Sequence, residues 1–454
     1  MSETLTPQSL KPQIERAVSL ASEKARRLGR RWNPADGAPV FTAGGRYTAR
    51  SWTQWTQGFQ YGIALLCFDL GGDRELLDGA RRRVAADMAE HLTHTGVHDH
   101  GFNNISTYGQ LRRLMLEGRV ERNEWELGFY ELALKVSGAV QASRWTGLPH
   151  GLGYIHSFHG SHSLFIDTMR SLRICAAAHL LGHALVGEQD QRVNLLSRVV
   201  AHAATSAAFN VYYGEGRDIY DLPALRGRTA HEAIFNPASG AFRCPSSQQG
   251  YSAFTTWTRG LAWAMLGFAE QLEFVHSLPE SEFDAESMPE KSQACAMLER
   301  AARATCDFYI GQASALDGVC YWDTGAPRLH QLGDWRGKPA EPFNDYEPVD
   351  SSASAIAAQG LIRLGRVLGT AGRGYLQAGL TVAQRLLEEP YLSVNPKHEG
   401  LLLHSVYHRP NGWDFIPPEA KIPCGESSMW GDYHLLEVFL LVARMAGNRY
   451  YTFY

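Results

Sequence analysis

The sequence lacks long hydrophobic runs and any excess of basic residues. Charged residues make up 20% of its 454 residues and the formal net charge is -4, unlike the strongly basic composition of nucleic-acid-binding domains. No stretch approaches the roughly 18 consecutive apolar residues of a membrane-spanning helix. The first thirty residues mix charges of both signs without an apolar core, so no secretory signal is expected. These absences predict a cytoplasmic protein that binds neither nucleic acid nor membrane.

Paired cysteines and metal motifs are also lacking. The seven cysteines are odd in number, scattered, and never spaced as a CxxC pair, a pattern typical of reduced thiols rather than of a disulfide framework or a zinc site. No metal-binding cluster and no glycine-rich nucleotide-binding loop is recognisable. The sequence therefore predicts no metal and no cofactor, and leaves the oligomeric state undetermined.

Strand-like alternation is rare, whereas apolar residues recur at helical spacing along most of the chain. The expected helices cover residues 8–29, 54–69, 74–93, 103–116, 123–142, 164–183, 188–206, 257–274, 290–311, 352–368, 371–388 and 432–446. An even number of helices without strand repeats favours antiparallel helix pairs wrapped in a ring over any α/β fold. We therefore predict an all-α protein, with residues 1–454 forming a single (α/α)6 barrel domain that carries a helical N-terminal extension over about residues 1–50.

Two long segments interrupt the helical pattern, at residues 213–249 and 318–349. Loops of this length inside a compact domain are usually functional or disordered. Trp322, Trp335 and Tyr346 in the second segment argue against disorder. We expect both segments to be ordered and to contribute to function.

Three aspartates stand out from their surroundings. Asp99 lies between two histidines, where a helix has ended, and there a simple turn acid is the structural alternative. Asp167 begins an apolar helix, where a carboxylate is costly to bury unless it is paired or its pKa rises. The structural alternatives for Asp167 are a favourable position at a helix start or an ion pair with Arg170 or Arg173. Asp350 precedes two serines and an apolar helix, which favours a helix cap.

Aromatic residues gather where loops enter helices. They occur in the segment SWTQWTQGFQYG, which contains Trp52 and Trp55, in FTTWTRGLAW, which contains Trp257 and Trp263, and in GESSMWGDYHLL. Each cluster alone would be core packing, but three at the same kind of junction indicate a lined cleft. Because the apolar faces of sugars stack on aromatic rings, the pattern indicates a sugar site. Arg259 lies between two of these tryptophans and could serve an anionic sugar.

Taken together, these segments resemble glycoside hydrolase family 88, the unsaturated glucuronyl hydrolases, and more loosely the unsaturated rhamnogalacturonyl hydrolases. The resemblance runs from about residue 50 to the end through WTQGF, HDHGF, FIDTMRSLRICAAA, SSQQGYSAFTTWTRGLAWAMLGFAE, PVDSSASAIAAQGL and GESSMWGDYHLLE, in the family's order. It implies an (α/α)6 barrel that removes a 4,5-unsaturated hexuronic acid from the non-reducing end of lyase-generated oligosaccharides. The implied reaction is hydration of the C4=C5 vinyl ether.

The resemblance also implies a set of site residues. Asp99 and Asp167 correspond to the essential acids, with Asp167 donating a proton to C4 and Asp99 remaining ionised. Substrate contacts are implied for Trp55, His98, His231, Gln249, Trp257, Arg259, Trp263, Ser427 and Ser428. For His231 the local match is thin, and a structural role at a helix end is the alternative. The two long loops differ from a compact family member, so the oligosaccharide accepted is not determined.

Other functions use the same barrel and remain open. A saturated β-glucuronidase would employ the two carboxylates in ordinary acid and base roles. A sugar epimerase would need a pair of histidines as bases, and no such pair stands out among the 18 histidines. A non-catalytic carbohydrate-binding protein would explain the aromatic residues but not the two acids.

Overall fold

Heavily buried helices alternate along the chain with helices that bury one face. The structure, a computed structural model, describes residues 4–50, 54–283 and 288–454. The helix α10 (Thr258–Ser277) is buried along almost its whole length. In α1 (Pro7–Arg31), buried residues recur every three or four positions, the pattern of a helix that packs on one side. The alternation separates an inner from an outer layer.

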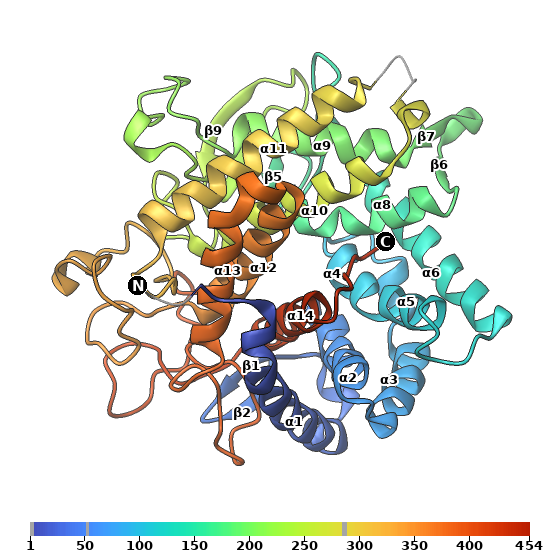
Figure 1. The fold of residues 1–454 in the computed structure, drawn as a ribbon. Coiled ribbons are helices and arrows are strands. Elements are labelled where there is room, and N and C mark those ends of the chain that lie inside the picture. Colours follow the sequence, from blue (N-terminus) through green and yellow to red (C-terminus); the bar gives the residue numbers. More distant parts are fainter. Residues whose placement is uncertain (1–3, 51–53, 284–287) are drawn as a thin grey trace.

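The inner layer closes into a ring. Contacts join α2 to α4, α4 to α7, α7 to α10, α10 to α12, α12 to α14, and α14 back to α2 (Figure 1). Its members are α2 (Gln57–Gly71), α4 (His100–Asn104) continuing through the π-helical turn Ile105–Gly109 into α5 (Gln110–Leu116), α7 (Thr168–Ser171) followed by α8 (Arg173–Leu180), α10, α12 (Ser351–Val367) and α14 (Met429–Ala446).

Between these inner helices lie α1, α3 (Arg74–Asp87), α6 (Glu124–Ser143), α9 (Leu195–Phe209), α11 (Lys291–Phe308) and α13 (Arg373–Leu386). When α4–α5 and α7–α8 are each counted as one helix, six inner helices alternate with six outer helices in the described residues. The predicted all-α (α/α)6 barrel is confirmed. The first helix, α1, packs against α2 and α14 and so occupies the outer layer beside them.

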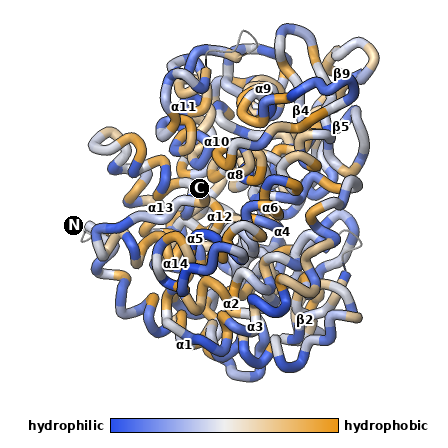
Figure 2. The backbone as a smooth tube through the Cα atoms, turned by 90° about the vertical axis from the view of Figure 1, so that its right-hand side faces the viewer, coloured by the Kyte–Doolittle hydropathy of each residue, from blue (hydrophilic) through white to orange (hydrophobic). Residues whose placement is uncertain are grey.

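Short strands lie in the connections between the helices. They form the pairs β1 (Pro39–Ala43) with β2 (Arg46–Ala49), β3 (Trp145–Gly147) with β4 (Gly153–Ile155), β6 (Ala184–Val186) with β7 (Arg192–Asn194), and a three-stranded sheet in the order β5 (Ser163–Phe165), β8 (Glu232–Phe235), β9 (Phe242–Ser246), all antiparallel. In Figure 2, β2, β4, β5 and β9 lie at one end, and both termini lie toward the other.

Three expected boundaries differ from the structure because strands pair across the chain. Residues 163–165 join a sheet, so the helix expected from residue 164 begins at Thr168. The helix expected from residue 188 begins at Leu195, where the Asn194 side chain accepts hydrogen bonds from the first turn. The 213–249 segment is partly strand, since β8 and β9 lie within it. Local hydrophobic spacing does not reveal such long-range pairing.

Charged side chains occupy the middle of the inner ring. Arg170 pairs with Glu270 and Glu437, and Arg173 lies 3.5 Å from Glu437. All four side chains are buried. The ion pair of Asp167 with Arg170 or Arg173, one of the alternatives from the sequence, does not form, because these arginines serve glutamates of α10 and α14.

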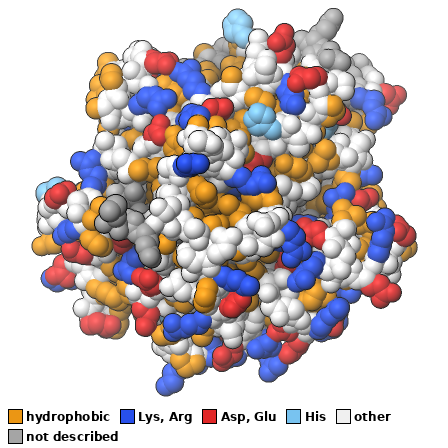
Figure 3. Space-filling view, viewed as in Figure 1, with side chains coloured by type: hydrophobic (Ala, Val, Ile, Leu, Met, Phe, Trp, Pro, Cys, Tyr) orange, Lys and Arg blue, Asp and Glu red, His pale blue; other side chains and the backbone are white. Residues whose placement is uncertain are grey.

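The end of the ring that carries the termini shows intermixed positive and negative side chains, with hydrophobic ones gathered near its centre (Figure 3). This agrees with the nearly balanced charge of the sequence. Among the described residues, no helix combines the length and the apolar composition needed to cross a membrane.

Candidate active site

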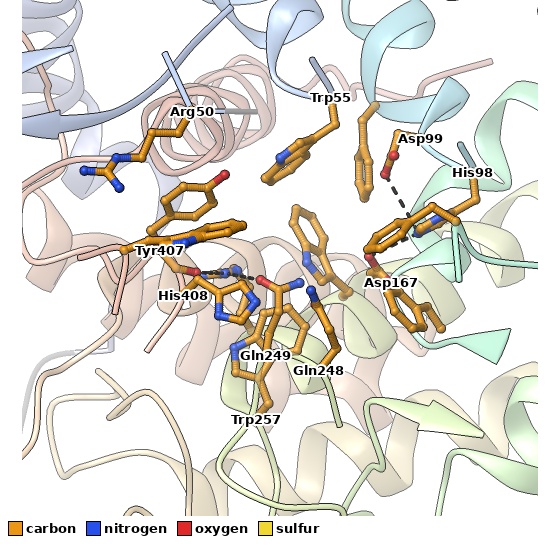
Figure 4. Close-up of a pocket in the computed structure, with 16 residues that line it drawn as sticks. Arg50, Trp55, His98, Asp99, Asp167, Gln248, Gln249, Trp257, Tyr407 and His408 are labelled. Atoms are coloured by element: carbon orange, nitrogen blue, oxygen red, sulfur yellow. Dashed lines mark hydrogen bonds and ion pairs between the residues drawn. The ribbon is translucent and has the colours of Figure 1, made fainter. Parts of the chain in front are cut away.

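A pocket opens where the inner helices begin. It holds about 750 Å³ of space free of protein atoms, its open mouth included. Its walls are formed by Arg50, Trp55, His98, Asp99, Phe102, Phe158, Phe165, Asp167, Gln248, Gln249, Trp257, Arg259, Trp263, Tyr407, His408 and Trp413 (Figure 4).

The key residues are brought together by one feature of the barrel. Trp55, Asp99, Asp167 and Trp257 each lie at or just before the first residue of an inner helix, namely α2, α4, α7 and α10. Because the inner helices form a closed ring and all begin at the pocket end, positions far apart in sequence converge there. Asp350 occupies the same position before α12.

Two buried carboxylates share one imidazole at the base of the pocket. His98 Nε2 lies 3.5 Å from Asp167 Oδ2 and 3.8 Å from Asp99 Oδ1, as the dashed lines in Figure 4 mark. The exposed fractions are 6% for Asp99 and 8% for Asp167. Asp167 Oδ1 is buried and has no hydrogen-bond partner among the described residues. Asp167 lines the pocket with the small exposed part of its side chain, so a bound molecule can reach its carboxylate.

The three groups differ in proton affinity. Burial raises the pKa of Asp99, and the Asp167 carboxylate adds to this rise against the opposing charge of His98. Burial acts on Asp167 in the same direction, but the hydrogen bond and positive charge of His98 outweigh it and lower its pKa. For His98, burial lowers the pKa, but the two carboxylates overcome this and raise it. Of the two alternatives that the sequence left open for Asp167, pairing or a raised pKa, the structure shows the pairing with His98, and the raised carboxyl pKa belongs to Asp99.

The same cluster is where a metal ion could bind. His98, Asp99 and Asp167 offer ligand atoms that all lie within 4.8 Å of one another. One imidazole and two carboxylates suit several divalent cations. The absence of a metal expected from the sequence remains a prediction.

The Arg259 side chain supports the wall of the pocket through hydrogen bonds. It donates to the Asp350 carboxylate at 3.0 Å, to the Gln249 side-chain oxygen at 2.9 Å, and to the backbone oxygens of Val406 and Tyr407. Only 1% of it is exposed. Much of its donor capacity is used within the protein, so it orients Gln249 and the 406–407 segment. Asp350 caps α12, as predicted, and in addition anchors this guanidinium.

His231 lies behind the pocket wall rather than in it. Its Nδ1 accepts the backbone N–H groups of Gln248 and Gln249, at 3.0 and 3.3 Å, and its ring packs between Phe165 and Trp257. Burial lowers its pKa to about 4, so the ring is neutral near pH 7. The structure therefore gives His231 a role in shaping the loop that presents the two glutamines.

Ser427 and Ser428 also lie outside the pocket lining, unlike the contact position implied by the resemblance. Ser427 Oγ donates to Asp432 at 2.7 Å. The Ser428 side chain caps α14 by accepting the backbone N–H of Gly431 at 3.1 Å. Both are buried. The serines of this motif therefore lie at the start of α14, where their side chains stabilise the beginning of the last inner helix.

Aromatic rings form the wall opposite the acids. Trp55 stacks on Trp430 with ring centroids 5.0 Å apart, and Tyr407 packs against Trp413 at 5.2 Å. The predicted residues Trp55, Trp257 and Trp263 all line the pocket. Trp52, noted in the same aromatic segment of the sequence, lies outside the described residues.

Eight of the lining residues were not anticipated as site residues from the sequence: Arg50, Phe102, Phe158, Phe165, Gln248, Tyr407, His408 and Trp413. Three of them come from the segment YHRPNGW, residues 407–413, which shows no helical periodicity. Its aromatic residues among Pro and Gly are a usable signal of a binding loop, but nothing local indicates that it reaches this pocket.

Comparisons with known proteins agree on one group of enzymes. No family model matches the chain. An unsaturated glucuronyl hydrolase of Bacillus sp. (strain GL1) is 26% identical over 454 residues, covering 96% of this chain and 97% of the relative. An unsaturated chondroitin disaccharide hydrolase of Streptococcus agalactiae is 22% identical, covering 86% of this chain and 81% of the relative.

Solved structures show the same fold. The crystal structure of the unsaturated glucuronyl hydrolase from Bacillus sp. GL1, described as responsible for the degradation of glycosaminoglycan, matches with a TM-score of 0.71 and 23% identity, covering 95% of this chain and 97% of that chain. A second, described as specific for heparin, matches with a TM-score of 0.73 and 17% identity, covering 97% of this chain and 100% of that chain.

Proposed function

Because this chain is a relative of the unsaturated glucuronyl hydrolases, we propose that it is a glycoside hydrolase acting on the C4=C5 bond of an unsaturated hexuronic acid. The substrate is an oligosaccharide left by a polysaccharide lyase, with the unsaturated sugar at its non-reducing end. A proton adds to C4, and water adds to C5 and loses a proton. The resulting hemiketal opens at the C5–O5 bond, and the new hemiacetal at C1 releases the remaining sugar chain as an alcohol.

The observation that supports this most is the cluster of His98, Asp99 and Asp167 inside an aromatic-walled pocket. Hydration of a vinyl ether needs a group that delivers a proton to carbon and then helps remove one from water. Asp167, which lines the pocket and is 8% exposed, is placed to do both. Since the bond at C1 is not displaced directly, carboxylate spacing does not decide between retention and inversion.

The proton reaches Asp167 from His98. In the free protein, His98 Nε2 lies 3.5 Å from Asp167 Oδ2, and the two carboxylates raise the pKa of His98, which favours a charged pair. When a sugar ring fills the pocket and excludes water, the charged pair becomes less favourable than neutral carboxyl and imidazole. Binding therefore transfers the shared proton to Asp167 next to C4. Asp167 takes up the proton that the attacking water loses, and this proton returns to His98 when the products leave. Asp99, 3.8 Å from the same imidazole, keeps its negative charge throughout.

The aromatic wall and the two glutamines hold the sugar. Trp257 and Trp55 offer apolar faces for stacking, and Gln248 and Gln249 offer amide hydrogen bonds. Arg259 and His231 fix these groups rather than bind the sugar themselves. In this proposal the residues 1–454 act as one catalytic unit, because α1 packs directly on the inner helices α2 and α14.

The cytoplasmic location expected from the sequence is also part of the proposal. All seven cysteines are free, and free thiols are usual in a reducing compartment.

The test is a comparison of substrates. The protein is incubated with unsaturated disaccharides from several lyases and with the matching saturated glucuronides, with and without a chelator. We expect the near-ultraviolet absorbance of the conjugated double bond to disappear, with or without the chelator. Cleavage of the saturated glucuronides alone would indicate an ordinary glucuronidase. Inversion of a sugar centre without cleavage would indicate an epimerase, and loss of activity with the chelator would place a metal at His98, Asp99 and Asp167.

A further inference from the structure

Arg144, at the end of α6, is a buried guanidinium that joins two segments of the active site. Its Nε donates to the backbone oxygen of His156 at 3.1 Å and its Nη2 to that of Ser157 at 2.7 Å. Its Nη1 donates to the backbone oxygen of Thr95. In return, the N–H of His156 donates to the Arg144 backbone oxygen at 2.9 Å. One side chain thus holds the chain four residues before Asp99 and the chain directly before Phe158.

Both joined segments reach the acid cluster. The first leads into His98 and Asp99, and the second presents Phe158, whose ring stacks on the His98 imidazole with centroids 5.9 Å apart. Phe158 also packs against Phe165 at 5.5 Å, just before Asp167. A displacement of either segment therefore changes the geometry around His98.

The hydrogen bonds of the Arg144 side chain go to backbone carbonyls. In residues 4–50, 54–283 and 288–454 it forms no ion pair with a carboxylate within 4.0 Å, and only 8% of it is exposed. Its positive charge acts instead on the neighbouring Asp99, His98 and His156. Burial lowers the pKa of Arg144, and the Asp99 carboxylate partly offsets this, so the two charges act on each other.

We propose that Arg144 is a positioning residue for the reaction: it clamps the His98–Asp99 segment to the Phe158 segment and supplies a fixed positive charge to the acid cluster. This inference rests on the proposed function. Lysine cannot replace it in geometry, because a single ammonium lacks the planar fork that reaches three carbonyl oxygens. Lysine can replace it in charge.

Two histidines near the cluster do not supply this charge near neutral pH. Burial lowers the pKa of His156 to about 4 and that of His202 to about 3, so both are neutral. His94 also faces Asp99, while His98 itself takes part in the proton transfer. Arg144 is the guanidinium group that acts on both His98 and Asp99. Its removal raises the pKa of both Asp99 and His98, because a nearby positive charge favours their deprotonated forms.

The experiment compares Arg144→Gln and Arg144→Lys with wild type and with Arg16→Gln, an exposed arginine of α1. For Arg144→Gln we expect kcat to fall by about a hundredfold, as for a displaced catalytic group, and both limbs of the pH–rate profile to move to higher pH. For Arg144→Lys we expect a smaller fall in kcat with the limbs unmoved. Thermal unfolding of each variant establishes that it is folded.

Loss of activity in Arg144→Gln without movement of the limbs overturns the proposal, as does a kcat within twofold of wild type. The titration of His98, followed by nuclear magnetic resonance on protein with labelled histidine, tests the charge without any substrate. We expect its pKa to rise in Arg144→Gln and not in Arg144→Lys, and an unchanged pKa in Arg144→Gln also overturns the proposal. Wild-type protein that leaves unsaturated substrates intact would instead refute the proposed function.

Discussion

Replacement of Asp167 by asparagine tests the acid cluster directly. The amide keeps the size of the side chain but cannot carry the mobile proton. Because His98 Nε2 lies 3.5 Å from Asp167 Oδ2, the change also removes one of the two charges that raise the pKa of His98. We expect kcat to fall by about 10²–10⁴, the usual contribution of a positioned general acid or base. This corresponds to about 2.7–5.5 kcal/mol of barrier height.

The assay follows the absorbance of the conjugated double bond at saturating and limiting substrate concentrations, so that kcat and KM are separated. KM should change little, because the aromatic wall and the glutamines are untouched. Asp190→Asn, at an exposed position, is the matched control and should behave as wild type. If Asp167→Asn is folded and retains kcat within tenfold, Asp167 is not the group that moves the proton, and Asp99 would take its place.

Three further predictions concern pH and stability. Activity should rise with pH as Asp99 loses its proton, at a pKa that burial raises above the usual value of aspartic acid. Activity should fall again as His98 loses its proton, at a pKa that the two carboxylates raise above the usual value of histidine. A pH–rate profile with an acid limb near 3.9 would contradict this. Glu437→Gln should lower the free energy of unfolding by about 3–5 kcal/mol, since it leaves Arg170 buried without one partner. Burial raises the pKa of Glu437, but Arg170 and Arg173 outweigh this and lower it. The stabilisation from Glu437 is therefore present above the ordinary pKa of glutamate and is lost as the pH falls toward the pKa of Glu437 in the folded protein. Thermal unfolding at several pH values measures this loss. Ser428→Ala should cost about 0.5–2 kcal/mol of stability as a lost helix cap and leave kcat/KM within twofold of wild type; a rise in KM without loss of stability would return Ser428 to the substrate.

The sequence by itself determined the barrel. The helical spacing of apolar residues located the twelve helices of the barrel. Each of them buries one face, so its apolar residues recur every three or four positions. The two acids and three of the tryptophans could be found for a related reason. Asp99, Asp167 and Trp257 lie immediately before the first residues of inner helices. The sequence pattern indicates where a loop ends and such a helix begins.

Only the tertiary structure decided how these groups act on one another. The placement of His98 between two carboxylates lowers the pKa of Asp167 and leaves the raised carboxyl pKa on Asp99, which decides between the two alternatives, pairing or a raised pKa, that the sequence left open for Asp167. Likewise, Arg259 lies between two tryptophans in the sequence, but its N–H groups donate hydrogen bonds to Asp350, Gln249 and backbone carbonyls. Proton affinity and hydrogen-bond partners depend on distances between segments far apart in the chain, and these distances exist only once the ring has closed.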